Sequence, residues 1–294
     1  MNILMIMADQ FRPDWMGCAG TDYVHTPYID GIARRGVRFP NAICNGPLCA
    51  PSRASIAAGV YPHRTGVMSN GENYPLDRTT YYQLLRKHGY RVSAIGKTDL
   101  HKPDHFYGEN GDTPVMYHLG FTDICDTEGK MNAAFRRTQG HRKDFAFHDY
   151  GGDKHIPEFE LAGPYQRYLK GKGHLTEFSR DYNARLFDKP AWYSGESVLP
   201  AEDFHDSYIG KRACDYLQTV GDESPWHLFV SFVGPHDPWD APAEYYERFK
   251  GKTFPAPPDD SMEGKPEWAK KKSQAASRGM APEDFKRSNG TMPA

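Results

Sequence analysis

The sequence lacks the features that mark disulfide-stapled, zinc-binding and nucleic-acid-binding proteins. Its 294 residues hold five cysteines, an odd number with irregular spacing and no CxxC pair. This pattern argues against a disulfide framework and against a cysteine zinc site. Lysine and arginine total 36 against 38 for aspartate and glutamate, so there is no excess of positive charge to attract nucleic acid or an anionic membrane surface. We therefore expect neither nucleic acid nor a membrane among the partners.

The start of the chain also lacks a leader pattern and a long hydrophobic run. The apolar run in MNILMIMADQ has no basic region before it and no small-residue cleavage site after it, and it ends at Asp9. These features argue against a signal peptide and against a membrane span. The run instead predicts a first buried strand, and the cytoplasm follows as the expected location.

The spacing of apolar residues predicts an α/β fold with a largely parallel central sheet. Three short apolar runs rich in branched residues are typical of buried parallel strands: 2–8, 90–96 and 227–234. Four segments between these runs have the apolar spacing or the capping residues of helices: 26–36, 52–59, 79–89 and 205–221. Strands that alternate with helices favour a parallel sheet.

Two stretches depart from this alternation. Residues 104–200 are rich in Gly, Pro, His and Tyr and have little periodicity, which predicts a loop-rich insertion over the sheet, where substrate specificity often resides. Residues 252–294 are poor in large aliphatic side chains and predict a linker-like end.

Polar side chains follow each of the three predicted strands. Asp9 and Gln10 follow the first strand, Lys97 and His101 follow the second, and His236 follows the third. Because parallel strands bring their carboxyl ends to one edge of a sheet, we expect these side chains to lie close together. Each residue alone has a more ordinary interpretation as a turn residue, a surface group or a structural histidine. Their joint placement favours a site.

A cysteine near the expected start of a helix joins this group. In PLCAPSRASIAAGVYPHRTG, Cys49 lies between prolines, and Arg53 follows in the first turn, where the helix dipole disfavours a cation unless an anion is nearby. Arg53 and Lys97 beside a helix N-terminus suit a tetrahedral oxyanion such as sulfate or phosphate. Asp9 and Gln10 offer the hard oxygens that suit Ca²⁺ or Mg²⁺, whereas a cysteine thiolate is a poor ligand for either ion.

The same stretch resembles the signature of a known family. C-A-P-S-R at 49–53, running on to GVYPHRTG at 59–66, closely resembles the signature of the type I, formylglycine-dependent sulfatases of the alkaline phosphatase-like superfamily. Four further segments fall in the family's order along most of the chain: NILMIMADQFRPDWMGCAG, TPYIDGIARRGVRFPNAIC, GKTDLH and FVGPHDPW. The resemblance implies an alkaline-phosphatase-like α/β sandwich around a largely parallel sheet.

The resemblance also implies a modified cysteine and a metal ion. A formylglycine-generating or sulfatase-maturating enzyme would oxidise Cys49 to formylglycine, whose hydrated aldehyde is both a nucleophile and an oxygen ligand. One divalent metal, with Ca²⁺ preferred to Mg²⁺ or Mn²⁺, would bind Asp9, Gln10 and the modified Cys49. The mismatch between a soft sulfur atom and a hard metal ion then disappears.

Further roles follow from the same resemblance. Arg53 would hold the formylglycine, Lys97 would contact the sulfate and the leaving oxygen, and His236 would bind the substrate and protonate the leaving group. The family usually has a histidine two residues after that lysine. This sequence has Asp99 at that position and His101 two residues further on, so His101 is included among the candidate catalytic residues.

The implied activity is hydrolysis of a small-molecule sulfate monoester. One geminal hydroxyl would attack the sulfur, the alcohol would leave, and the second hydroxyl would then expel sulfate. A phosphonate monoester or phosphodiester hydrolase of the same superfamily is the main alternative, because it shares these motifs. An inactive truncated sulfatase is a third. An ordinary cysteine hydrolase would need a histidine base beside Cys49. The sequence does not distinguish carbohydrate, aryl and choline groups as the alcohol half of the ester.

Parts of the family pattern have no counterpart in the sequence. The family normally supplies further metal ligands from a later strand, in a segment such as Ser-Asp-His-Gly or Asp-Asn, together with another lysine, but no apolar strand follows residue 234. We therefore expect 1–294 to be the N-terminal part of a sulfatase catalytic domain, with the C-terminal part of the domain absent. As a whole product it would have little activity and an exposed apolar sheet edge.

Overall fold

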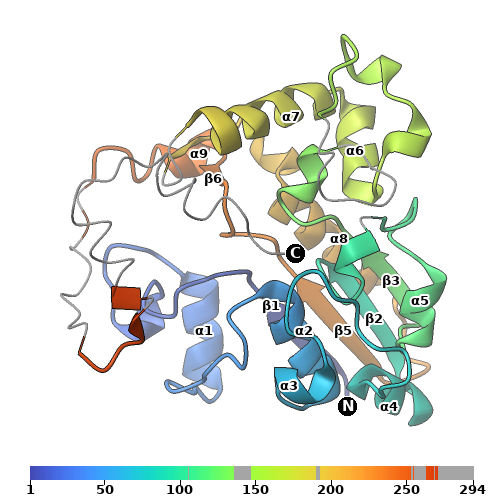
Figure 1. Cartoon of the computed structure of the whole chain (residues 1–294). Helices are drawn as coiled ribbons and strands as arrows, with labels where there is room; N and C mark the ends of the chain where they lie inside the picture. Colours follow the sequence, from blue (N-terminus) through green and yellow to red (C-terminus); the bar gives the residue numbers. More distant parts are fainter. Residues whose placement is uncertain are drawn as a thin grey trace.

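The architecture is a mixed α/β fold around a parallel sheet (Figure 1). The computed structural model describes residues 1–104, 106–135, 147–189, 193–252, 254, 263–267 and 269–270. The predicted linker-like end at 252–294 lies largely outside the described residues.

Four strands form the central sheet: β1 (Ile3–Met7), β2 (Arg91–Gly96), β3 (Asp123–Asp126) and β5 (Trp226–Ser231). Their order is β1-β5-β2-β3, and each neighbouring pair is parallel. The three predicted strands and the parallel sheet are confirmed. The sequence pattern does not predict β3, because DICD places only two apolar residues between aspartates.

Four helices match the helical patterns of the sequence: α1 (Pro27–Arg35), α2 (Cys49–Ala58), α4 (Tyr81–Lys87) and α8 (His205–Thr219). The threonine cap predicted for α4 is present as a capping box, in which Thr80 and Gln83 each accept the other's backbone N–H. Helix α2 begins three residues before the predicted position 52. Cys49 is therefore the first residue of this helix and does not precede it.

The strands carry two apolar cores, one on each face of the sheet. On one face, Leu228 and Val230 pack with Ile209 of α8, and on the other face Phe229 packs with Tyr82 of α4. This alternation is expected because successive side chains of a strand point to opposite faces. Since both faces of β2 and β5 are covered, these two strands are fixed in position and support the loops at their carboxyl ends.

The loop-rich stretch predicted at 104–200 also contains α-helices that the sequence pattern does not reveal. Three α-helices occur there: α5 (Pro114–His118), α6 (Pro164–Lys172) and α7 (Leu175–Asn183). Two of them begin with a proline at the first helical position, and α6 ends at Gly173 in the left-handed conformation. The proline and glycine content that suggested loops therefore marks helix ends.

The remaining elements are short. A second, two-stranded parallel sheet pairs β4 (Ser194–Glu196) with β6 (Trp239–Ala241). The short α-helices are α3 (Pro62–Thr65) and α9 (Ala243–Tyr246). A π-helical turn spans Ala184–Asp188. Six 3₁₀ turns are described: Gly17–Ala19, Lys102–Asp104, Asn132–Ala134, Asp153–His155, Glu158–Glu160 and Ala201–Asp203.

One edge of the sheet is open. Among the described residues only β5 pairs with β1, and the β1 side chains Leu4 and Ile6 are 47% and 56% exposed. Helix α1 has no buried residue. Parallel sheets are normally covered on both faces, but the described residues leave these two β1 side chains exposed.

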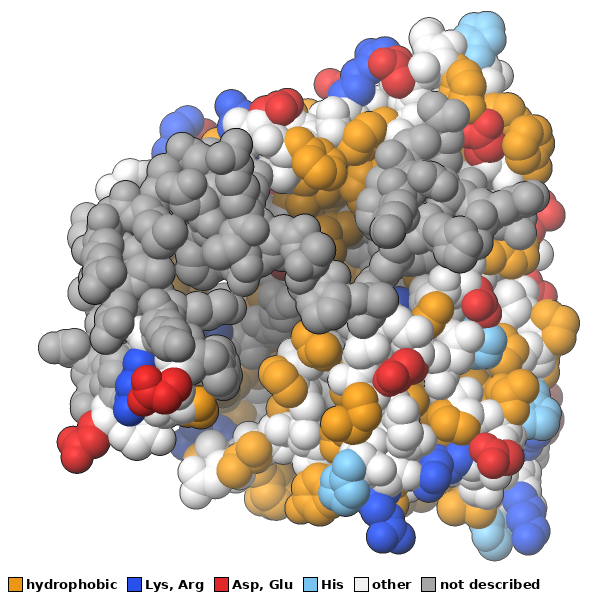
Figure 2. Space-filling view, in the orientation of Figure 1, with side chains coloured by type: hydrophobic (Ala, Val, Ile, Leu, Met, Phe, Trp, Pro, Cys, Tyr) orange, Lys and Arg blue, Asp and Glu red, His pale blue; other side chains and the backbone are white. Residues whose placement is uncertain are grey.

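The surface carries charges of both signs. On the face drawn in Figure 2, acidic and basic side chains are interspersed and form no continuous patch of one sign. Within the described part of the chain, no helix combines the length and the apolar character that crossing a membrane requires.

Candidate active site

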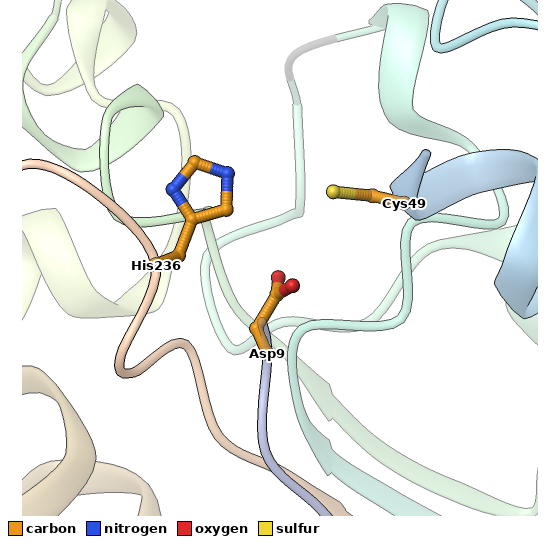
Figure 3. Close-up of side chains that lie close together, drawn as sticks. All are labelled: Asp9, Cys49 and His236. Carbon is orange, nitrogen blue, oxygen red and sulfur yellow. The ribbon is translucent and has the colours of Figure 1, made fainter. Parts of the chain in front are cut away.

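Loops that follow β1 and β5, together with the start of α2, bring three reactive side chains together. Asp9, Cys49 and His236 point toward one another (Figure 3), and one ligand atom from each lies within 4.8 Å of the others. The Asp9 backbone N–H donates to the Gly234 carbonyl at 3.0 Å, which ties the end of β1 to the loop that carries His236. The predicted convergence at the carboxyl edge of the sheet is present for these residues.

Small side chains place Cys49 close to the sheet. Ala50, Ala54 and Ala57 of α2 are each at most 1% exposed, so this helix packs closely in the apolar core that it shares with β2 and β5. The Ala50 backbone N–H, one of the groups without a partner inside the helix, donates to the Asn70 Oδ1 atom at 3.0 Å. This contact anchors the first turn of α2, whose first side chain, Cys49, faces Asp9 and His236.

Two buried cations surround Asp9. The Lys97 Nζ atom lies 2.5 Å from Asp9 Oδ2 and 3.4 Å from Cys49 Sγ. The Arg53 guanidinium lies 3.5 Å from the same carboxylate oxygen and donates to the Lys97 carbonyl at 2.5 Å and to Ser231 Oγ at 2.7 Å. Arg53 therefore joins α2 to the ends of β2 and β5, which fixes the cysteine relative to the sheet.

A second buried carboxylate, Asp99, lies on the other side of the same cations. Its Oδ2 atom is 3.3 Å from Lys97 Nζ, 3.1 Å from Lys102 Nζ and 3.9 Å from Arg53 Nε. Asp99 is 2% exposed and has φ 52°, a conformation that non-glycine residues rarely adopt. The turn after β2 therefore places both Lys97 and Asp99 inside the charge network.

The surroundings of Cys49 favour its thiolate. Burial raises the pKa of the Cys49 thiol, but the hydrogen bond with His236 and the charge of Lys97 outweigh burial, so the pKa is lowered. Asp99 opposes this effect and Lys102 adds to it. Burial lowers the pKa of His236, but the hydrogen bond with Cys49 outweighs it, so the pKa of His236 is raised.

The carboxylates stay ionised although they are buried. Burial raises the pKa of Asp9, but Lys97 and Arg53 more than compensate, so that this pKa lies below its usual value. The same balance holds the pKa of Asp99 far below its usual range, because Lys97, Lys102 and Arg53 all face it. Burial lowers the pKa of Lys97, yet Asp99 and Asp9 raise it above the usual value. The site is thus a set of fixed charges.

Two predicted residues are not part of this group. Gln10 is exposed, has φ 60°, and makes no side-chain hydrogen bond to the group within the described ranges. The His101 ring bonds to Asp104. The structure brings together Asp9, Cys49, Arg53, Lys97 and His236. Roles for Gln10 and His101 stay predictions from the family resemblance.

Two supporting residues were not predicted from the sequence. Lys102 is a third cation of the network, and the only prior signal for it is its spacing from Lys97. The buried Lys130 donates to the carbonyls of His236 at 3.1 Å and Pro238 at 2.6 Å, and it pairs with Asp240 at 2.6 Å. Lys130 thereby holds the loop that carries His236. No periodicity marks a lysine in the segment after β3.

The donor set suits a metal ion only in part. The described cluster offers one carboxylate, one thiol and one imidazole. Ca²⁺ takes six to eight oxygen ligands and a thiol is a soft ligand. Asp9 fits a hard divalent ion, and Cys49 fits one only if its sulfur is replaced by oxygen. The described residues therefore supply part of a Ca²⁺ site.

Asp126 supports the turn that carries Lys97 and Asp99, since its Oδ1 atom accepts the Thr98 backbone N–H at 2.9 Å. Burial raises the pKa of Asp126 from 3.8 to about 8. Between these values the folded chain keeps a proton that the unfolded chain has lost, so the free energy of unfolding falls as pH rises through this window. We expect Asp126→Asn to stabilise the chain by more than about 2 kcal/mol at pH 8 and far less at pH 4, measured by urea unfolding.

Asp123→Asn, on the same strand, is the matched control. The hydrogen bond from Arg91 lowers the pKa of Asp123, so this variant should lose stability above pH 4, modestly because the side chain is 37% exposed. A stabilisation by Asp126→Asn that is equal at pH 4 and pH 8 would contradict the assignment.

Fold and site together define an α/β protein in which the start of a helix, two buried cations and a cysteine meet beyond the carboxyl ends of parallel strands. The sulfatase family model, described as "Sulfatase", matches residues 1–277. The chain belongs to the sulfatase family.

The sulfatases that align with this chain are longer than it is. It is 29% identical over 251 residues to the choline-sulfatase of Rhizobium meliloti (strain 1021) and 27% identical over 267 residues to the arylsulfatase of Clostridium perfringens (strain 13 / Type A). These alignments cover 85% and 87% of this chain but 41% and 47% of the relatives. The chain therefore spans less than half the length of the relatives it matches.

Solved structures show the same fold. The phosphonate monoester hydrolase from Silicibacter pomeroyi matches with a TM-score of 0.61 and 22% identity, over 87% of this chain and 46% of that one. A protein in complex with its substrate D-glucosamine-2-N,6-O-disulfate matches with a TM-score of 0.57 and 23% identity, over 92% of this chain and 42% of that one. At these identities the likeness establishes the alkaline-phosphatase-like fold alone.

Proposed function

We propose that this chain carries the nucleophile half of a sulfuric ester hydrolase that cleaves sulfate monoesters. The observation that carries the proposal is the position of Cys49. It opens α2 inside a C-x-P-S-R motif and faces Asp9 and His236, with Lys97 3.4 Å from its sulfur. Relatives named choline-sulfatase and arylsulfatase support this reaction class.

The chain's own residues would bind the ester and stabilise its charge. Lys97 and the N-terminus of α2 face the position where the sulfate oxygens would lie, and Arg53 holds both elements in register. His236 has a raised pKa, and one of its ring nitrogens lies within 4.8 Å of the Cys49 sulfur, so it can hold a proton near the leaving oxygen. Lys130 keeps the His236 loop in place.

Formylglycine made from Cys49 by a maturating enzyme would supply an oxygen nucleophile, and a divalent ion, preferably Ca²⁺, would add positive charge beside it. Asp9 and the modified Cys49 are the described residues that would hold the ion, with Gln10 as a further candidate from the resemblance. The cytoplasmic location also stays a prediction.

We further propose that residues 1–294 form the N-terminal part of a sulfatase catalytic domain. The open edge of β1 and the share of each relative that is covered support this division. The remaining metal ligands would then come from a segment outside the sequence described above.

A phosphonate monoester hydrolase is the second candidate, favoured by the fold of the Silicibacter pomeroyi enzyme. A singly charged phosphonate ester would suit the same cations. Rates of hydrolysis of 4-nitrophenyl sulfate and 4-nitrophenyl phenylphosphonate by the same preparation separate the two. Faster phosphonate cleavage would overturn the sulfatase assignment.

The first test is the mass of the tryptic peptide that contains Cys49, taken from the native source, together with the mass of the intact protein. We expect an aldehyde or its hydrate at position 49 and turnover of an aryl sulfate. An unmodified thiol without turnover would favour an inactive remnant. An intact mass well above 33.3 kDa would identify a longer enzyme of which this chain is a part.

A further inference from the structure

Asp99 is placed so that it subtracts positive charge from the anion site. Its Oδ2 atom faces Lys97, Lys102 and Arg53 at 3.3, 3.1 and 3.9 Å. Its Oδ1 atom is buried and has no hydrogen-bond partner among the described residues. Among the described residues, its side-chain polar contacts are thus with the cations alone, and its backbone has a left-handed φ of 52°.

The charges of five side chains in this network nearly cancel before a metal ion is counted. Arg53, Lys97 and Lys102 contribute three positive charges, and Asp9 and Asp99 contribute two negative charges. These residues therefore leave one net positive charge. An uncharged residue at position 99 would leave two.

We propose that Asp99 is a specificity-determining residue, which matches the site to an ester group that carries one negative charge and excludes groups that carry two. The inference rests on the proposed function, because it concerns the same anion position. Sulfate monoesters, phosphonate monoesters and phosphodiesters carry one charge on the reacting group. A phosphate monoester has a second pKa near 6 and carries two above neutral pH.

Asp99 is linked to the nucleophile position through one cation. Asp99 Oδ2 lies 3.3 Å from Lys97 Nζ, and the same Nζ atom lies 3.4 Å from Cys49 Sγ. At such short range a unit charge in a partly buried site changes the free energy of an anion by enough for at least a tenfold change in affinity. This change in binding free energy is about twice as large for a dianion as for a monoanion. The ratio of the dissociation constants of the two esters therefore reports the charge of residue 99.

The test compares two esters of one alcohol at pH 8.5. Dissociation constants of 4-nitrophenyl sulfate and 4-nitrophenyl phosphate are measured by calorimetry, in EDTA, on full chains that carry Cys49→Ala so that neither ester is consumed. We expect the added change Asp99→Asn to improve phosphate binding at least about tenfold more than sulfate binding. A purely structural loss would weaken both esters alike.

A second variant and a control complete the test. Lys102→Gln removes a cation from the same network and should weaken phosphate binding more than sulfate binding, which keeps the inference testable if Asp99→Asn does not fold. Asp14→Asn removes a carboxylate whose side chain is 55% exposed and should leave the ratio unchanged. If the parent binds the sulfate ester and the ratio shifts less than twofold in both network variants, this inference is wrong and the proposed function stands. If the parent binds neither ester, both are wrong.

Discussion

Replacing Cys49 with alanine is expected to lower sulfate ester hydrolysis by at least about 10⁴-fold, because it removes the atom on which the nucleophile is built. Lys97 and His236 would still bind the ester, but no nucleophile would remain to attack its sulfur atom. The measurement is release of 4-nitrophenol from 4-nitrophenyl sulfate by the full-length native protein and by its Cys49→Ala variant, each produced together with a sulfatase-maturating enzyme. Substrate affinity should change far less than turnover.

Cys214 provides the matched control. It is an exposed cysteine on α8 that takes no part in the described site. Cys214→Ala should keep the parent's turnover. Iodoacetamide alkylates free thiols, so it should leave the turnover of parent molecules that carry formylglycine at position 49 unchanged. Turnover by Cys49→Ala at the parent's rate would show that another residue is the nucleophile.

The strands of the central sheet could be predicted where most residues of a strand are apolar. The segments at 2–8, 90–96 and 227–234 are apolar because parallel strands are buried on both faces, and all three are strands. Strand β3 has polar residues at both ends and, among the described strands, pairs with β2 alone, so its sequence resembles a loop. The helices within 104–200 are short and obtain their stability from tertiary packing, which local sequence does not report.

The site was predictable where topology alone decides position. Asp9, Lys97 and His236 each follow a parallel strand, so their convergence follows from the sheet. Gln10 and His101 follow the same strands, but the direction of a side chain depends on one or two backbone angles. The positive φ at Gln10 illustrates this dependence.

Charge compensation could not be predicted in the same way. Asp99 has no pattern that distinguishes it from a surface aspartate. Its burial against Lys97, Lys102 and Arg53 appears only once the turn after β2 is seen in three dimensions.

Arg53→Ala should be the most destabilising substitution in the site, with a loss of at least about 3 kcal/mol in the free energy of unfolding. Arg53 is 5% exposed and lies between the buried carboxylates Asp9 and Asp99. Its removal leaves both with less compensation and removes the donors to the Lys97 carbonyl and Ser231 Oγ. Deleting one partner of a buried ion pair costs more stability than the intact pair contributes, because the remaining buried charge is no longer compensated.

Arg64, eleven residues further along the same motif, is exposed and gives the matched control. Arg64→Ala should change the free energy of unfolding by less than about 0.5 kcal/mol, as is usual for surface positions. Arg53→Lys separates charge from geometry. It keeps the positive charge but not the fork of donors, so its stability should lie between the parent and Arg53→Ala in urea unfolding at pH 7. If Arg53→Ala unfolds within about 1 kcal/mol of the parent, the arginine does not tie α2 to the sheet, and the position of Cys49 must have another cause.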